Sequence, residues 1–578
     1  MNDNAYWSRW WRERASRRRV LTAGGMAATG VAGLALVGCG DDSDDGGDGA
    51  KPTEDRSSQL TPVSSTPDPD KPVAGGTLRV LGNIGSILDP HRTNTPTESI
   101  DIWGRVGNFL IRNSTKDPIG FPEADLAATL PEVPGDGTVL IFKIRPEAKW
   151  QNKAPVSGRA VTAEDVKLSF DRIRDPNIKS PRAGNYGNVE SITVVDERTV
   201  QFKLKAPQAD LLSIMADQYD FVLPKEISSR GLDAIKTAAD VIGSGPYELA
   251  SFEAAQKFNM KRRTDGYWRP NTAWLDGYEY THQTDPQQLT NALRAGQTDA
   301  IGLFSVDHVR TFENDKGYVI VKAPTSTREC LLINHGKDRY KDPRVRLALS
   351  RAINRKQVYE TVFAGIVGGP MTPAGPAWAL PDAELVKLPG YGDRATEIKE
   401  AKALLAAAGL GTGFEETVLT VTAFSTEQVH EVVVSNLAEV GIKVKTENVG
   451  TDFAANFLPR EVQRQYNLAT TLFLSGAYPD AQLLLYHHSD TKTKGTRNYG
   501  DYVNKDLDVK LEKQSTMYDT KARQALVWEI QRDIINAPGP AWIGSRMVFG
   551  IYNARVRNAA AFPFAAGYWG AENMWIKS

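Results

Sequence analysis

The stretch DRYKDPRVRLALSRAI, Asp338–Ile353, marks where the second half of the fold begins. Asp342 is a favourable N-cap, and Pro343 follows at the first helical position, where proline is tolerated. Four apolar residues recur at the spacing of one helix face: Val345, Leu349, Ala352 and Ile353. Three arginines fall on the other faces: Arg344, Arg346 and Arg351. The sequence therefore predicts an amphipathic helix that begins at Pro343.

A strand-like run, Cys330–Asn334 (CLLIN), precedes this helix. We interpret the strand, loop and helix as the point where the chain leaves one lobe and enters a second. Because its neighbours Leu331, Leu332 and Ile333 are apolar, Cys330 is expected to be a buried structural thiol and not a nucleophile.

Strand and helix patterns alternate on both sides of this stretch. Upstream we expect a capped helix at Val161–Ile173, a hairpin of Ser191–Val195 with Thr199–Leu204, and a βαβ unit over Gly277–Leu303. Downstream we expect a helix capped by Thr396 and closed by Gly409, then a strand at Val418–Phe424, a helix at Glu427–Val440, and strands at Ile442–Val449 and Asn467–Leu474. Such alternation predicts an α/β fold with a parallel, doubly wound lobe.

The N-terminal residues 1–38 have the pattern of an export signal. Six arginines precede an apolar run from Val20 to Gly38, and SRRRVL (16–21) resembles a twin-arginine signal. LVGC (36–39) resembles a lipobox, in which Cys39 would be lipidated and become the first mature residue. The alternative is a single membrane anchor, since 19 residues approach a spanning length. Residues 39–74 contain few apolar side chains and are expected to form a flexible tether.

Composition argues against several classes of function. The chain has 578 residues and a formal net charge of −1, which gives no case for nucleic acid as a partner. No cofactor fingerprint or nucleophile elbow occurs, so we expect a non-enzyme without cofactor or metal. His430-Glu431 lacks the second histidine of a zincin, and the adjacent His487 and His488 cannot easily share a metal. A Ser–His–Asp set assembled in space stays an open alternative.

Nine segments in order resemble the family-5 extracellular solute-binding proteins, the peptide and nickel receptors of bacterial ABC importers. They are GGTLRV with LDP (75–90), IRPEAKW with VTAEDVKLSFDRI (144–173), GSGPY with GYW (243–268), ALRAGQTDAI (292–301), DPRVRLALSRAI (342–353), AKALLAAAG (401–409), LAEVGIKVK (437–445), YPD (478–480) and GDYVNKDLD (500–508). The resemblance implies a two-lobed, type II periplasmic-binding-protein-like fold with two crossovers. The expected domains are lobe I at 75–324 with an inserted subdomain at about 113–214, lobe II at 325–537, and a return to lobe I at 538–578.

The resemblance also suggests where a ligand would bind. Peptide-binding members commonly hold the ligand amine with an aspartate shortly before the Tyr-Pro-Asp turn, and the matching position here is Ala477. A carboxylate is the group that pairs a buried ammonium, so this substitution weakens the case for peptides. The candidate ligand-binding residues are Tyr478, Asp480, Arg497, Trp378 and Trp103. Each has an alternative role, respectively in the core, as a turn cap, on the surface, as a loop anchor and beside the core.

The sequence thus predicts a lipid-anchored, monomeric receptor on the outer face of the cell membrane. It would capture a small solute, with a short peptide-like ligand favoured, and deliver it to an ABC permease and ATPase complex. Nickel chelates, opines, sugar oligomers and siderophores remain possible cargo, because a fold does not fix its ligand. The alternatives are an exported hydrolase that uses the same cleft, and a peptide-binding sensor or chaperone that is not coupled to transport.

Overall fold

The computed structural model describes residues 70–577, apart from 94–97, 115–120, 218, 304–305, 364–365, 373–377, 424–425, 474–475, 477, 493–495 and 560–570. The predicted export signal, Cys39, residues 40–69 of the tether and Ala477 therefore lie outside the described residues. No helix within the described ranges combines the length and apolar character needed to cross a bilayer.

The first lobe, as we name it here, is built around β1 (Thr77–Gly82), which lies between two parallel neighbours. These are β9 (Gly277–His282) and β10 (Ala300–Leu303). Helix α7 (Pro286–Arg294) connects them, and the Asp285 side chain caps it by accepting from the Gln288 amide. The predicted βαβ unit is confirmed, with β1 inserted between its two strands. Strand β8 (Lys257–Arg262) pairs antiparallel with β9, and β7 (Tyr247–Glu253) pairs antiparallel with β8 at the edge of the sheet.

A separate three-stranded sheet in the same lobe contains the predicted hairpin. Strand β6 (Thr199–Leu204) pairs with β5 (Val189–Asp196) on one side and with β4 (Val139–Lys143) on the other. Helix α4 (Ala163–Arg174) packs on this sheet, and Thr162 and Asp165 form the predicted capping box.

The GSGPY segment is explained by close backbone packing in the first lobe. A Cβ atom on Gly243 would lie 1.8 Å from the carbonyl oxygen of Val106, and one on Gly245 would lie 2.6 Å from that of Arg105. Only glycine permits this approach to α3 (Gly104–Val106), so the motif serves packing within the lobe.

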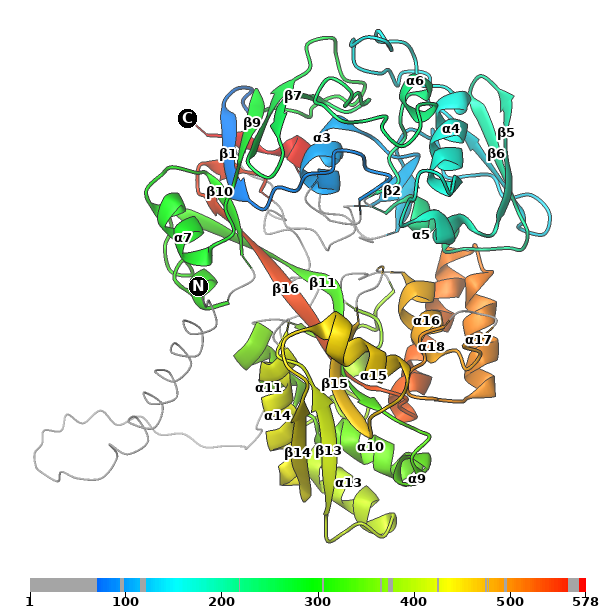
Figure 1. The fold of residues 1–578 in the computed structure, drawn as a ribbon, viewed down its shortest axis with the longest axis vertical. Helices are drawn as coiled ribbons and strands as arrows, with labels where there is room; N and C mark the ends of the chain where they lie inside the picture. Colours follow the sequence, from blue (N-terminus) through cyan, green and yellow to red (C-terminus); the bar gives the residue numbers. More distant parts are fainter. Residues whose placement is uncertain are drawn as a thin grey trace, which may run out of the picture. The chain divides into compact units, whose positions relative to one another are not determined.

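Two long antiparallel strands, β11 (Tyr318–Ile333) and β16 (Ala541–Asn553), run from the first lobe into the second (Figure 1). At one end β16 pairs with β10, and at the other β11 pairs with β15 (Leu468–Phe473). One path of hydrogen-bonded strands therefore passes through both lobes. The strand predicted at Cys330–Asn334 begins much earlier, at Tyr318, because Pro324 and the polar residues after it interrupt the apolar pattern without ending the strand.

The second lobe has the predicted parallel core. Strand β13 (Phe414–Thr420) lies between β14 (Ile442–Asn448) and β15, parallel to both. The predicted opening helix is α10 (Pro343–Ala352), with Asp342 accepting from the Arg344 amide at 2.8 Å. Arg346 lies off the apolar stripe, yet it is buried and donates to the carbonyl oxygens of Tyr340, Lys341 and Pro538.

Helix α13 (Arg394–Ala407) starts one turn earlier than predicted. Its N-cap is Asp393, whose carboxylate accepts from the Thr396 amide, so Thr396 lies inside the first turn. Gly409 follows the helix with φ +78°, as a glycine at the C′ position requires.

The remaining elements complete the two lobes. The strands are β2 (Ile111–Asn113), β3 (Pro122–Ala124), β12 (Ile366–Val367), β17 (Val556–Arg557) and β18 (Trp575–Ile576). The helices are α5 (Leu211–Met215), α6 (Lys225–Ser228), α8 (Val306–Arg310), α9 (Asp338–Lys341), α11 (Arg355–Val358), α12 (Asp382–Leu385), α14 (Thr426–Glu439), α15 (Leu458–Val462), α16 (Leu485–His487), α17 (Lys505–Ser515) and α18 (Thr520–Asn536). Short helical turns are η1 (Glu98–Trp103), η2 (Ala183–Tyr186), η3 (Tyr359–Phe363), η4 (Phe453–Phe457), η5 (Asp480–Leu484) and η6 (Ala571–Asn573). Val556, Ala559 and Met574 join the first-lobe core.

Replacing the cap of α10 tests the helix that the sequence marks most clearly. Asp342→Ala removes the acceptor for the Arg344 amide and should lower the free energy of unfolding by about 1 kcal/mol. Asp338→Ala is the control, because the Asp338 side chain is 96% exposed and forms an exposed ion pair with Lys341. Urea denaturation measures both variants, and equal stabilities would contradict the assigned cap.

Candidate functional site

A cavity of about 50 Å³ lies between the lobes. Its first-lobe wall is formed by Phe121, Pro122, Leu130, Ala209, Leu212 and Ser213. Its second-lobe wall is formed by Trp378, Met517, Tyr518, Thr520 and Arg523. This volume holds about one or two water molecules, so the lobes are packed closely here.

Aromatic side chains cross between the lobes in both directions. Phe121 of the first lobe packs edge-on against Trp378 of the second, with ring centroids 5.0 Å apart. In the opposite direction, Tyr478 and Tyr518 pack against the first-lobe core. The hydroxyl of Tyr518 donates to the Gly137 carbonyl and accepts from the Gln208 amide. Each lobe thus buries aromatic surface of the other.

A buried ion pair joins the lobes beside this cavity. The side chain of Asp210, just before α5, is 0% exposed and accepts from the guanidinium of Arg523 on α18, which is 3% exposed. Its second oxygen accepts from the Asp480 amide. The side-chain oxygen of Gln514 also accepts from Arg523. Asp210 and Arg523 therefore each have a hydrogen-bond partner besides the opposite charge.

The pKa of the Asp210 carboxyl is raised to about 7. Burial is the largest cause and the nearby Asp480 carboxylate acts in the same direction, whereas the positive charge of Arg523 lowers this pKa. Arg523 is therefore what favours the ionised form of Asp210 in this contact. A backbone hydrogen bond of 2.7 Å from the Ala209 amide to the Ser515 carbonyl joins the two lobes at the same place.

Three of the residues predicted from the sequence lie at this junction. Trp378 lines the cavity with 3% of its surface exposed, and the Arg523 guanidinium lies 5.1 Å from its ring centroid. Tyr478 is half-buried against the first-lobe core, and removal of its hydroxyl from solvent raises the pKa of that group. Asp480 accepts from Gln514 and Ser515, so its carboxylate already has partners.

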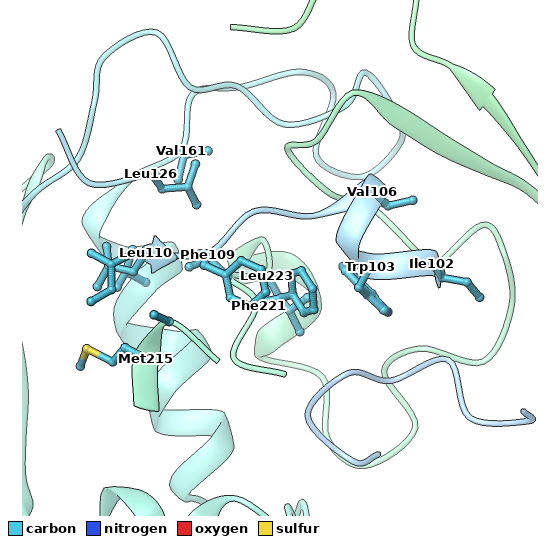
Figure 2. Close-up of a cluster of buried hydrophobic side chains, with 14 of the residues drawn as sticks. Ile102, Trp103, Val106, Phe109, Leu110, Leu126, Val161, Met215, Phe221 and Leu223 are labelled. Atoms are coloured by element: carbon cyan, nitrogen blue, oxygen red, sulfur yellow. The ribbon is translucent and has the colours of Figure 1, made fainter. Parts of the chain in front are cut away.

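The other two predicted residues lie elsewhere. Arg497 is exposed and lines a separate cavity of about 10 Å³ in the second lobe, with Tyr486 and Tyr499. Trp103 lies inside the first-lobe core, beside Phe221 (Figure 2), where it is 0% exposed and donates to the Leu88 carbonyl at 2.7 Å. In this structure Trp103 has no surface that a ligand could contact.

The histidines considered for metal binding have other partners. The ring nitrogens of His430 lie 3.1 Å and 2.8 Å from the hydroxyls of Thr470 and Thr446, and burial lowers the pKa of His430 to about 4. His487 lies beside Trp542, whose indole N–H donates to it. His488 contacts Glu512 at 3.0 Å. The histidine pair thus faces two different neighbours.

Sequence reasoning did not find Asp210, Arg523, Phe121 or Tyr518. Asp210 and Arg523 are 313 positions apart, and no local pattern marks either as a contact between lobes. The only available signal was Asp210 itself, a cap-type residue just before the apolar run LLSIM.

The fold and the cavity between its lobes define a class of protein: a two-lobed α/β binding protein of the periplasmic type. The chain belongs to the bacterial extracellular solute-binding proteins, family 5, whose sequence model matches residues 122–496. It is therefore a solute-binding protein that acts outside the cytoplasm.

The chain is also similar to three known proteins. The glutathione-binding protein GsiB of Escherichia coli O1:K1 / APEC is 25% identical over 437 residues, which cover 74% of this chain and 81% of GsiB. The structure of HbpA2 from Haemophilus parasuis is 20% identical with a TM-score of 0.75, covering 87% of this chain and 100% of HbpA2. The periplasmic binding protein DppA from Helicobacter pylori, in complex with the peptide STSA, is 22% identical with a TM-score of 0.62 and covers 88% and 99%.

Removing the acidic partner should loosen the junction between the lobes. Asp210→Ala removes the carboxylate that is hydrogen-bonded to Arg523 and leaves it the more distant Asp480 carboxylate at 4.0 Å. Breaking a buried ion pair costs about 3–5 kcal/mol when the remaining charge stays buried. Separating the lobes relieves this cost by hydrating Arg523, so we expect a larger radius of gyration in ligand-free small-angle scattering. Asp233→Ala is the control, since its pair with Lys236 is exposed. An unchanged radius and melting temperature in Asp210→Ala would contradict this role.

Proposed function

We propose that this protein is the substrate-binding lipoprotein of an ABC importer. It captures a small, peptide-like solute between its lobes and delivers it unaltered to the permease and ATPase complex. The observation that carries this proposal is the junction itself: aromatic rings and a buried ion pair of the two lobes meet around one cavity. The named ligands of two similar proteins, glutathione and the peptide STSA, support a short peptide or a derivative of one.

The proposed domain boundaries are those set by the sequence. Lobe I spans 75–324 with an inserted subdomain at about 113–214, lobe II spans 325–537, and residues 538–578 return to lobe I. In favour of a boundary near 325, the register of β11 against β16 shifts between Pro324 and Arg328. In favour of the return, β16 pairs with β10 of the first lobe.

Trp378, Tyr478 and Asp480 are the proposed ligand-binding residues at the junction. When the lobes separate, Trp378 loses Phe121 and becomes free to stack on an apolar part of the solute. Asp480 keeps Gln514 and Ser515, which lie in its own lobe, and it offers its remaining acceptor capacity to a ligand amine. Arg497 and Trp103 are weaker candidates, because one lies outside the cavity wall and the other inside the core.

The proposed anchor is a lipid on Cys39, behind a twin-arginine signal, with residues 40–74 as the tether. It would hold a monomer at the outer face of the cell membrane, next to its permease. No nucleic acid partner and no catalytic step belong to this proposal.

Binding of short peptides tests the function. Purified protein is first analysed by native mass spectrometry for co-purified solute, and pools of di- to pentapeptides are then titrated by calorimetry. Trp378→Ala should weaken binding about tenfold or more, because it removes an aromatic contact at the centre of the site. Trp528 on α18 packs against Leu380 and Leu385 and does not line the cavity, so Trp528→Ala should bind like the wild type. Equal affinities of the two variants would place the ligand elsewhere.

Lipidation is tested separately from ligand binding. Cys39→Ala removes the thiol that would carry the acyl chains, so the protein should move from the membrane fraction to the soluble fraction and lose metabolic labelling with palmitate. Cys330→Ala is the control, because Cys330 is buried and should leave both readouts unchanged. Membrane retention of Cys39→Ala would favour the alternative of an uncleaved membrane anchor.

A further inference from the structure

Arg328 is a buried arginine at the point where β11 enters the second lobe. It is 1% exposed and lies in register with Phe473 on β15 and with Ser545 on β16. Phe473 is the last residue of β15, so Arg328 lies at the carboxyl end of that parallel strand. This is the edge at which parallel α/β sheets bind their ligands.

Only one of the three guanidinium nitrogens of Arg328 has hydrogen-bond partners among the described residues. Its Nη1 donates to the carbonyl oxygens of Pro370 and Gln482. Its Nε and Nη2, both buried, have none. The guanidinium lies against two aromatic rings, with its carbon 4.1 Å from the ring centroid of Trp542 and 5.0 Å from that of Tyr486.

No carboxylate neutralises Arg328 within the described part of the chain. The adjacent Glu329 points to the opposite face of the strand, where its carboxylate accepts from Arg546. Burial lowers the pKa of Arg328 to about 10, so its charge is retained at neutral pH at a cost in desolvation. Arg523 offers the contrast, because that buried arginine has Asp210.

The surroundings of Arg328 connect it to the candidate ligand site. Gln482, whose carbonyl accepts from Arg328, also accepts from the Thr372 amide and donates to the Gly476 carbonyl with its side chain. Its amide donates to the Tyr478 carbonyl. Arg328 therefore lies directly beneath the segment that carries Tyr478 and Asp480.

The two unpartnered donors have a specific geometry. Nε and Nη2 lie along one edge of the guanidinium, and this edge binds a carboxylate side-on through two parallel hydrogen bonds. A single water could satisfy one donor, but a carboxylate satisfies both and also supplies the missing charge. The aromatic rings fix the plane of the group, so the fork is preorganised for such a partner.

We propose that Arg328 is the anchor for a carboxylate of the transported solute, and thus that the solute is an acid. This inference rests on the proposed function and narrows its ligand class. Arg328, Pro370 and Gln482 all belong to the second lobe, and the edge is closed to solvent in this structure. For a solute carboxylate to reach it, the segment that carries Tyr478 and Gln482 has to shift once lobe opening removes the first lobe from Tyr478. A purely structural role, in which Arg328 only ties Pro370 and Gln482 together, is the competing explanation that the experiment must exclude.

The experiment compares acids with matched neutral ligands. Pools of di- to pentapeptides are titrated as free acids and as C-terminal carboxamides, into the full-length wild type, Arg328→Lys and Arg346→Lys. We expect the wild type to bind acids at least tenfold tighter than carboxamides. Arg328→Lys keeps the charge and loses the fork, so its affinity for acids should fall at least tenfold while its affinity for carboxamides stays constant. Arg346→Lys should retain the preference, because Arg346 is a buried arginine that likewise donates only to carbonyl oxygens.

The outcomes separate this inference from the proposed function. A wild type that binds acids and carboxamides equally, or carboxamides alone, overturns the role of Arg328 and leaves a peptide receptor standing. An equal loss for both ligand forms in Arg328→Lys assigns a structural role and also overturns it. A wild type that binds no member of either pool overturns both proposals. If Arg328→Lys melts too early to be titrated, Arg328→Gln is titrated in its place, and a preference for acids that survives in this variant overturns the role of Arg328.

Discussion

The pairing of β11 with β16 is the constraint on which the rest of the structure depends. These two strands run antiparallel from the first lobe into the second, and every sheet hydrogen bond that links the lobes in the described residues passes through them. Pro324 has no amide to donate, and the register shifts between it and Arg328. The ladder is therefore interrupted between Pro324 and Arg328, where a change in the angle between the lobes breaks fewest backbone bonds.

The junction between the lobes combines contacts of different character. Phe121, Trp378, Tyr478 and Tyr518 bury apolar surface, which favours the closed arrangement in water. Asp210 and Arg523 lose hydration when they meet, and the attraction between them offsets much of that loss without a large surplus. Contacts of this kind give a closed state with a defined geometry and a modest stability. A bound solute can therefore shift the equilibrium between open and closed states.

Asp210 and Arg328 illustrate two ways to bury a charge. The charge of Asp210 is balanced from the opposite lobe, so it is sensitive to closure. Arg328 is balanced by aromatic faces and two carbonyl oxygens, and it keeps one edge of its guanidinium without a partner among the described residues. The first arrangement is complete within the chain, whereas the second has the donors of a binding site without the acceptor.

The sequence by itself determined the local elements and their order. Helix α10 with its Asp342 cap, the capping box of α4, the β5–β6 hairpin and the βαβ unit around α7 all follow from signals within a few residues, because capping and periodicity act over one or two turns. Nine such segments in order also indicated the family that the comparisons confirm. The aromatic and acidic turn at Tyr478–Asp480 was found in the same way, although its role as a ligand site stays a prediction.

Only the tertiary structure decided what those elements do to one another. Arg346 is on a polar face of its helix by periodicity, yet carbonyl oxygens of α9 and of the segment before β16 bury it. Trp103 is inside the core because Phe221, 118 positions away by sequence, packs on it. The Asp210–Arg523 pair and the unpartnered edge of Arg328 likewise depend on groups hundreds of residues apart. Burial and charge pairing are set by distance in space, and a linear sequence records distance only along the chain.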